Sequence, residues 1–107
     1  MNSFKFIPLL PILLTLNACS WVELTAEGEK VRVLGEDEVA RCTFKGKSTV
    51  SVTEKIVGAR RHDKSIQEEL VIIARNGARN LDGDTIVAAS PESEGKQVFK
   101  VYRCVPK

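Results

Sequence analysis

The sequence predicts an α+β fold in which one helix packs on a small, mostly antiparallel sheet, in the chain order strand, strand, helix, strand, strand. Segments that alternate apolar and polar residues lie on both sides of one segment whose apolar residues recur with the period of a helix. Each element therefore has one apolar face to bury, and a helix laid across a sheet buries them together. Three cysteines add the expectation of one disulfide.

Two strands are expected before the helix. Val31 and Val33 alternate with charged neighbours, which is typical of a half-buried strand that Gly35 ends. The short stretch that follows, before Cys42, is long enough for one helical turn. The second strand then contains Val50 among hydroxyl residues and β-branched neighbours. Gly46 predicts a turn or bulge at its start, and residues 58–62 end it.

The helix has the clearest pattern in the chain. Its apolar face is predicted from offsets of 0, 4, 7, 11 and 15, which give Ile66, Leu70, Ile73, Gly77 and Leu81. Ser65 followed by Glu68 has the spacing of a capping box, and Asp63 is the alternative cap. Gly83 suits the left-handed position after the helix. Gly77 on the apolar face predicts a close approach to the sheet.

Two strands are expected after the helix. The first covers residues 84–89 and is followed by a polar turn at residues 91–95. The second covers residues 97–104 and has apolar members on both faces, which favours a central position in the sheet. Because Cys104 ends this strand and Cys42 begins an earlier one, a disulfide between them would join two strand ends, on neighbouring strands.

The first 18 residues have the layout of a bacterial signal peptide. Lys5 supplies a positive start, residues 6–16 an apolar stretch that is too short to span a bilayer, and Ala18 a small residue. Residues 16–19 resemble a lipobox, in which Cys19 is acylated and becomes the first residue of the mature protein. The alternatives are a soluble protein cleaved after Ala18, or a buried core segment.

Acylation of Cys19 would attach the chain to membrane lipid. Lipoproteins of this type carry two or three acyl chains, which makes the anchor effectively permanent. Ser20 follows the cysteine where an Asp would retain an enterobacterial lipoprotein at the inner membrane, so export to the outer membrane is expected. Residues 19–28 then form a lipidated tether, which can partly dock on the domain or on the membrane surface. Residues 29–107 form a single domain that faces the periplasm.

Removing Cys19 from the count leaves Cys42 and Cys104. An even remainder in an oxidising periplasm predicts a structural disulfide. It would close a loop of about 60 residues and contribute roughly 4 kcal/mol. A redox pair is the alternative, although the C-x-x-C spacing of redox sites is absent.

The sequence predicts few other sites. Arg60, Arg61 and Lys64 surround His62 as a basic cluster that could contact anionic lipid, or could simply be a solvated loop. Residues 80–84 superficially resemble a cation loop, but a helix cap explains the glycine better. We expect no metal, no cofactor and no catalytic residues. The mature net charge near +1 and the few aromatic residues argue against a nucleic-acid partner.

Seven segments carry a family resemblance, which spans nearly all of the mature chain: the lipobox and residues 29–33, 37–42, 45–46, 74–76, 83–87 and 102–104. They resemble a family of small proteobacterial lipoproteins known only as a domain of unknown function. Residues 75–87 are also similar, more weakly, to the RcsF-like outer-membrane stress sensors, which carry two disulfides where this chain can form one. The resemblance bears mainly on fold and location, and from the whole sequence we expect a non-enzymatic envelope structural or interaction module. The alternatives are a stress sensor that binds outer-membrane proteins, and an envelope enzyme or ligand-binding protein.

Overall fold

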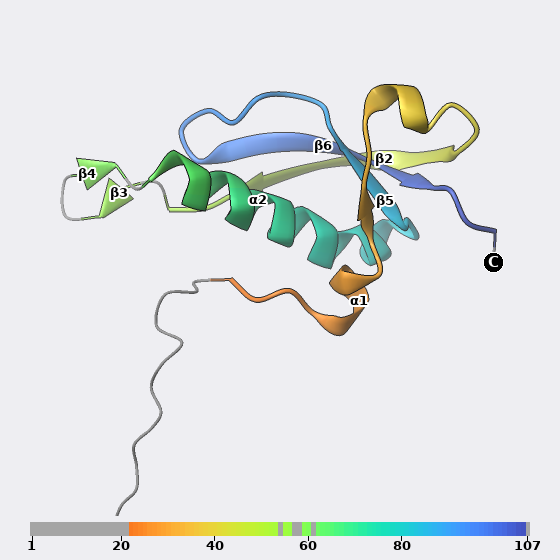
Figure 1. Cartoon of the computed structure of the whole chain (residues 1–107), viewed down its shortest axis with the longest axis horizontal. Helices are drawn as coiled ribbons and strands as arrows, with labels where there is room; N and C mark the ends of the chain where they lie inside the picture. The colour runs from red at the N-terminus through yellow and green to blue at the C-terminus, as the bar shows by residue number, and fades with distance from the viewer. Residues whose placement is uncertain (1–21, 54, 57–58, 61, 107) are drawn as a thin grey trace, which may run out of the picture.

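The computed structural model describes residues 22–106 apart from positions 54, 57, 58 and 61. Its elements in chain order are α1 (Ala26–Glu29), β1 (Arg32–Val33), the 3-10 turn η1 (Glu36–Glu38), β2 (Thr43–Ser51), β3 (Lys55–Ile56), β4 (Ala59–Arg60), α2 (Asp63–Ala78), the 3-10 turn η2 (Arg79–Leu81), β5 (Thr85–Ala88) and β6 (Lys96–Arg103). Figure 1 shows α2 lying along one face of the sheet. Within these residues, no helix is long and apolar enough to cross a bilayer.

The main sheet has the strand order β1-β5-β6-β2, and β3 and β4 form a separate hairpin. The β5–β6 and β2–β6 pairs are antiparallel and the β1–β5 pair is parallel. The predicted α+β class with a mostly antiparallel sheet is therefore confirmed, as is the central position of the last strand. The predicted bulge is also present, since Phe44 pairs with Tyr102 and Gly46 with Val101, leaving Lys45 as the extra residue.

The core lies between α2 and one face of the sheet. It consists of buried apolar residues from five segments of the chain: Val31, Val50, Ile66, Leu70, Ala74, Ala78, Ile86, Phe99 and Val101. Ile66 and Leu70 of the predicted helix face are fully buried, and Ile73 and Leu81 pack partly buried against the core. The other fully buried helix residues are Ala74 and Ala78, which continue the spacing of four. Gly77 was wrongly expected to allow a close approach, because a methyl group added there would meet nothing within 4 Å.

Both ends of α2 differ from the prediction. The helix begins at Asp63, and the cap is His62, whose Nδ1 accepts a hydrogen bond from the Lys64 N–H at 3.2 Å; the predicted Ser65 cap lies inside the first turn. The left-handed residue after η2 is Asp82, with φ 62° and ψ 35°, in place of Gly83. Gly83 is needed for another reason: a methyl group there would overlap the Val101 side chain of β6.

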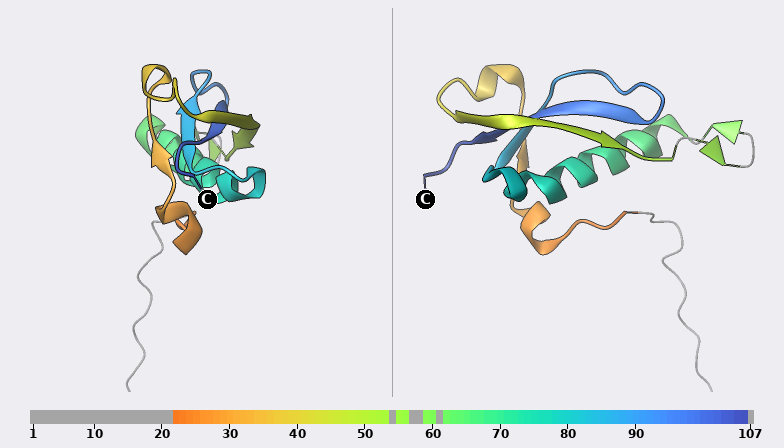
Figure 2. Two further views of the ribbon diagram at one scale, coloured as in Figure 1. Left: turned by 90° about the vertical axis from the view of Figure 1, so that its right-hand side faces the viewer. Right: turned by 180° about the vertical axis from the view of Figure 1, so that it is seen from behind.

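Three local features were not expected. The first strand is only two residues long and leaves Val33 50% exposed, although Val31 is buried as predicted. The β3–β4 hairpin occupies part of a segment that was expected to be a break. The α1 helix lies within the predicted tether, and Figure 2 shows it on the side of α2 that faces away from the sheet.

Candidate functional site

The segment that precedes β1 is clamped onto α2 by the side chain of Asn76. Its Oδ1 accepts hydrogen bonds from the Thr25 N–H at 2.9 Å and from the Thr25 hydroxyl at 3.1 Å, and its Nδ2 donates to the Glu23 carbonyl at 2.9 Å. Thr25 also caps α1, because its hydroxyl accepts a hydrogen bond from the Gly28 N–H at 2.9 Å. One amide side chain thus holds the backbone on both sides of Leu24.

Arg75 extends this clamp to the end of α1. Its Nε donates to the Gly28 carbonyl at 3.1 Å and its Nη2 to the Glu29 carbonyl at 3.2 Å. Gly28 is buried, and any added Cβ would overlap the Asn76 amide oxygen, so the backbone of α1 lies directly against the Asn76 side chain. Arg75 and Asn76 therefore form what we call the tether clamp, which receives residues 23–29.

The tether clamp was not predicted as a site from the sequence. Arg75 was interpreted as a charge near the helix end, and Asn76 only as part of the family resemblance. The available signal is Asn76 itself, because asparagine has low helix propensity and here it lies within the last turn of α2. Docking of the tether on the domain is one of the two possibilities that the sequence left open.

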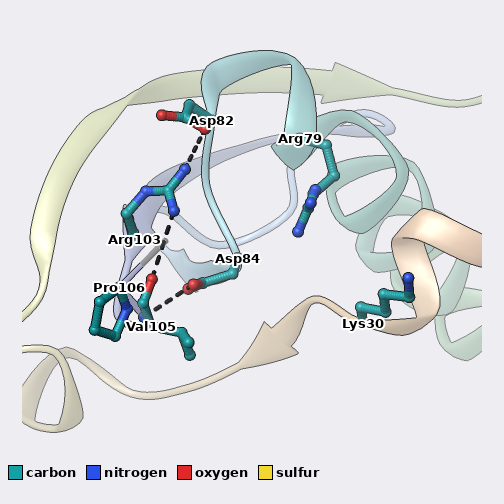
Figure 3. A pocket seen from close by; sticks show the side chains of 7 residues that line it. All are labelled: Lys30, Arg79, Asp82, Asp84, Arg103, Val105 and Pro106. Carbon is teal, nitrogen blue, oxygen red and sulfur yellow. Dashed lines mark hydrogen bonds and ion pairs between the residues drawn. The ribbon is translucent and has the colours of Figure 1, made fainter.

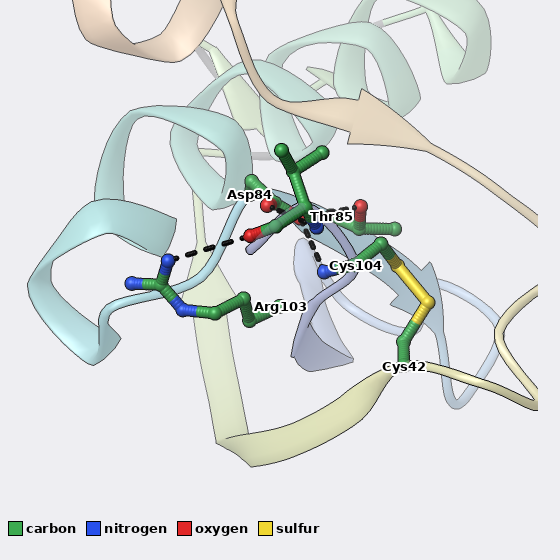
Figure 4. The surroundings of a disulfide bond; sticks show 6 residues. Cys42, Asp84, Thr85, Arg103 and Cys104 are labelled. Atoms are coloured by element: carbon green, nitrogen blue, oxygen red, sulfur yellow. Dashed lines mark hydrogen bonds between the residues drawn. A yellow bond between two sulfur atoms is a disulfide. The ribbon is translucent and has the colours of Figure 1, made fainter. Parts of the chain in front are cut away.

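The predicted disulfide joins Cys42 and Cys104, whose Cα atoms are 4.4 Å apart, and it ties the start of β2 to the end of β6 (Figure 4). Asp84 lies beside it and accepts hydrogen bonds from the backbone N–H of Cys104 at 2.8 Å and of Val105 at 2.9 Å. Burial alone would raise the pKa of Asp84, but these bonds, the Thr85 hydroxyl and the charge of Arg103 together lower it below its usual range. The carboxylate thus fixes the chain just after the last strand.

A hollow of about 470 Å³ opens between this end of the sheet and α1 (Figure 3). Both carboxylates on its wall are already engaged: Asp84 with backbone, and Asp82 with Arg103 and with Lys45 Nζ at 3.8 Å. These contacts explain residues 80–84 without a cation. No group of three or more His, Cys, Asp or Glu side chains able to hold a metal occurs in the described ranges.

The face of the sheet turned away from α2 forms a second candidate surface. Phe44 is 52% exposed and packs edge-to-face on Tyr102, with ring centroids 5.6 Å apart. Next along the strands, Lys47 lies opposite Lys100, and Thr49 lies opposite Val98. We call these six residues the open-face strip. At its far end, Thr49 and Val98 line a mostly apolar hollow of about 470 Å³ together with Pro91 and Lys96.

The turn η1 covers part of this face. Glu36 accepts a hydrogen bond from Lys100 Nζ at 2.8 Å, and this contact raises the pKa of Lys100 above its usual value. Val87 of β5 is buried although it pairs with Lys100 and lies on the same side of the sheet. The turn η1 therefore covers this face only on the β5 side, as far as β6, and leaves the β2 side exposed.

The predicted lipid-contact cluster is only partly described. Arg61 lies outside the described residues, and Arg60 is placed as backbone in β4. Lys64 is exposed in the first turn of α2, beside the capping His62. Cys19 and Ser20 also lie outside the described residues, so lipidation stays a prediction.

A model of the protein family described as "Domain of unknown function (DUF4156)" matches residues 22–104. No curated protein and no solved structure matches the chain. The match starts at the first described residue, so the matched region includes the segment held by the tether clamp.

Proposed function

The chain belongs to the DUF4156 family, and from this premise we propose that it is a lipid-anchored outer-membrane module. It is attached through Cys19 and presents a non-enzymatic interaction domain to the periplasm. The observation that carries the proposal is the tether clamp. Because residues 23–29 are held on α2, at most three residues separate Cys19 from the docked part of the chain, and they span at most about 10 Å.

Two further features support this proposal. The Cys42–Cys104 disulfide is typical of an oxidising compartment such as the periplasm. The clamp lies on the side of α2 away from the sheet, so an anchor at Cys19 would leave the open-face strip directed away from the membrane (Figure 1). A sensor that works across the periplasm would need a long linker, and the docked tether shortens the reach that residues 19–28 could otherwise provide.

Cys19→Ala tests the anchor. We expect the protein to lose metabolic palmitate label and to move from the membrane fraction to the soluble fraction, whereas Cys42→Ser, which removes a different thiol, keeps the label. A membrane-bound, labelled Cys19→Ala protein would contradict the proposal.

Ser20→Asp tests the destination of the same anchor. In a host that sorts lipoproteins by this position, we expect the label to remain and the protein to shift from outer to inner membrane on a density gradient. An unlabelled wild-type protein in the soluble fraction would contradict both the anchor and the destination.

A further inference from the structure

We propose that the open-face strip and the free edge of β2 together bind an extended acidic segment of a partner protein. This inference rests on the proposed function only for the compartment in which the partner is met. The surface itself is argued from the charges, the pairing and the exposure of β2 and β6.

The charged side chains of β2 and β6 all have the same sign. Their basic residues are Lys45, Lys47, Lys96, Lys100 and Arg103, and neither strand contains an acidic residue. Asp82 pairs with Lys45 and Arg103, and Glu36 pairs with Lys100. Lys47 and Lys96 make no ion pair within the part of the chain that the structure describes. The surface is thus complementary to carboxylates.

Lys47 is placed where folding alone would not favour it. It lies directly opposite Lys100, and like charges facing each other across two strands are destabilising. Glu36 neutralises Lys100 and leaves the ammonium of Lys47 exposed beside it. Phe44 is a large apolar side chain on the same face and is half exposed. Both residues fit a surface that a partner covers.

The backbone of β2 can also take part. The strand spans nine residues and, in the described sheet, pairs only with β6, so one side of its backbone faces outward. The bulge is confined to its first half, and pairing from Lys47 to Ser51 is regular. An added strand would form main-chain hydrogen bonds along this edge, which is how sheets recruit extended peptides. Its alternate side chains would fall on the open-face strip.

This combination favours a polypeptide over an anionic polysaccharide. A strand-like segment can use the backbone edge, meet Lys47 with a carboxylate, and place apolar side chains on Phe44 and in the hollow beside Val98. A polysaccharide would use only the charges. Lysines on an edge strand can instead serve to prevent pairing with other chains, and the experiment separates that role from binding.

The probe is a capped eight-residue peptide of two Glu-Thr-Val-Thr repeats, one strand face of which alternates Glu and Val. It is added to the full-length protein as isolated from cells, in detergent micelles. Calorimetry should show binding that weakens as salt increases, and hydrogen exchange should slow at the β2 amides. Lys47→Glu should weaken binding at least tenfold, whereas Lys30→Glu, with the same charge change away from the strip, should not. Phe44→Ser should weaken binding, whereas Val33→Ser on the short edge strand β1 should not.

Several results would overturn the inference. They are absence of peptide binding, equal binding of the same peptide with Lys in place of Glu, slowed exchange elsewhere than at β2, or binding of polygalacturonate in place of the peptide. Unchanged peptide affinity in Lys47→Glu with new self-association would assign Lys47 to edge protection and would also overturn it. The membrane or soluble fraction from which the protein is recovered reports separately on Cys19, so failure of the anchor and failure of the surface are distinguishable.

Discussion

The two faces of the sheet use similar residue types for different purposes. On the face covered by α2, Phe99 and Val101 are at most 1% exposed and belong to the core. On the other face, Phe44 is 52% exposed, packs on Tyr102 and is followed along the strands by the facing pair Lys47 and Lys100. Burial on the first face stabilises the fold, whereas the second face is free to be optimised for contact with another molecule. Matched substitutions of one residue type in two surroundings test this difference.

The largest effect is expected from the two phenylalanines. Phe99→Ala should lower the free energy of unfolding by about 3–5 kcal/mol, because it leaves a cavity under α2. Phe44→Ala should cost about 1 kcal/mol at most, since it loses only the edge-to-face contact with Tyr102. Urea denaturation measures both. Equal losses would mean that the open face is as important to folding as the covered one.

The glycines at the end of α2 should change stability in opposite directions. Gly83→Ala should destabilise by roughly 1–3 kcal/mol, because its methyl group would overlap Val101 and approach the Tyr102 carbonyl. Gly77→Ala should stabilise by about 0.5–1 kcal/mol, because it improves helix propensity where there is open space. Thermal unfolding of the two variants distinguishes them, and destabilisation by Gly77→Ala would contradict the position of the buried stripe on α2.

The smallest difference is expected between two aspartates. Asp84→Asn should lower the free energy of unfolding by about 1–2 kcal/mol, because an amide N–H₂ replaces an oxygen that accepts hydrogen bonds from backbone N–H groups. Asp82→Asn keeps a residue that tolerates the left-handed backbone and weakens partly exposed ion pairs, so it should lower the free energy of unfolding by less than about 1 kcal/mol.

The Asp84 effect should also depend on pH. Because the pKa of Asp84 is lower in the folded protein, the stability it contributes is present above the unfolded value, about 3.9, and is lost as pH falls through the folded pKa. The difference in the free energy of unfolding between wild type and Asp84→Asn, measured from denaturation curves, should therefore become smaller below about pH 4. A gap that stays constant down to pH 2 would show that the carboxylate charge is not involved.

Much of the fold was predictable because it depends on local periodicity. The alternation in residues 97–104 and the helical period from Ile66 onward identify the central strand and the single helix. The two cysteines that remain once Cys19 is set aside identified the Cys42–Cys104 pair. The details at the helix ends were not predictable, since His62, Ser65 and Asp63 are all plausible near a helix start and backbone geometry chooses among them.

The candidate surfaces were less predictable, because they depend on which segments meet. The role of Asn76 depends on residues 23–25, which lie against it only in the folded chain. Phe44 and Lys47 became part of one strip only through the register of β2 on β6, which the bulge at Lys45 sets. The role of Gly83 likewise depends on the position of Val101, which is 18 residues away along the chain.

The sequence by itself determined the main helix, the long strands, the cysteine pair and the expected address at Cys19, because periodicity, parity and short motifs are properties of neighbouring residues. The tertiary structure alone decided which faces are covered, where the tether docks and which lysines stand opposite each other. These depend on contacts between segments up to 64 positions apart, as between Glu36 and Lys100, and no local pattern encodes them. The side of β2 and β6 left uncovered is therefore a property of the whole fold.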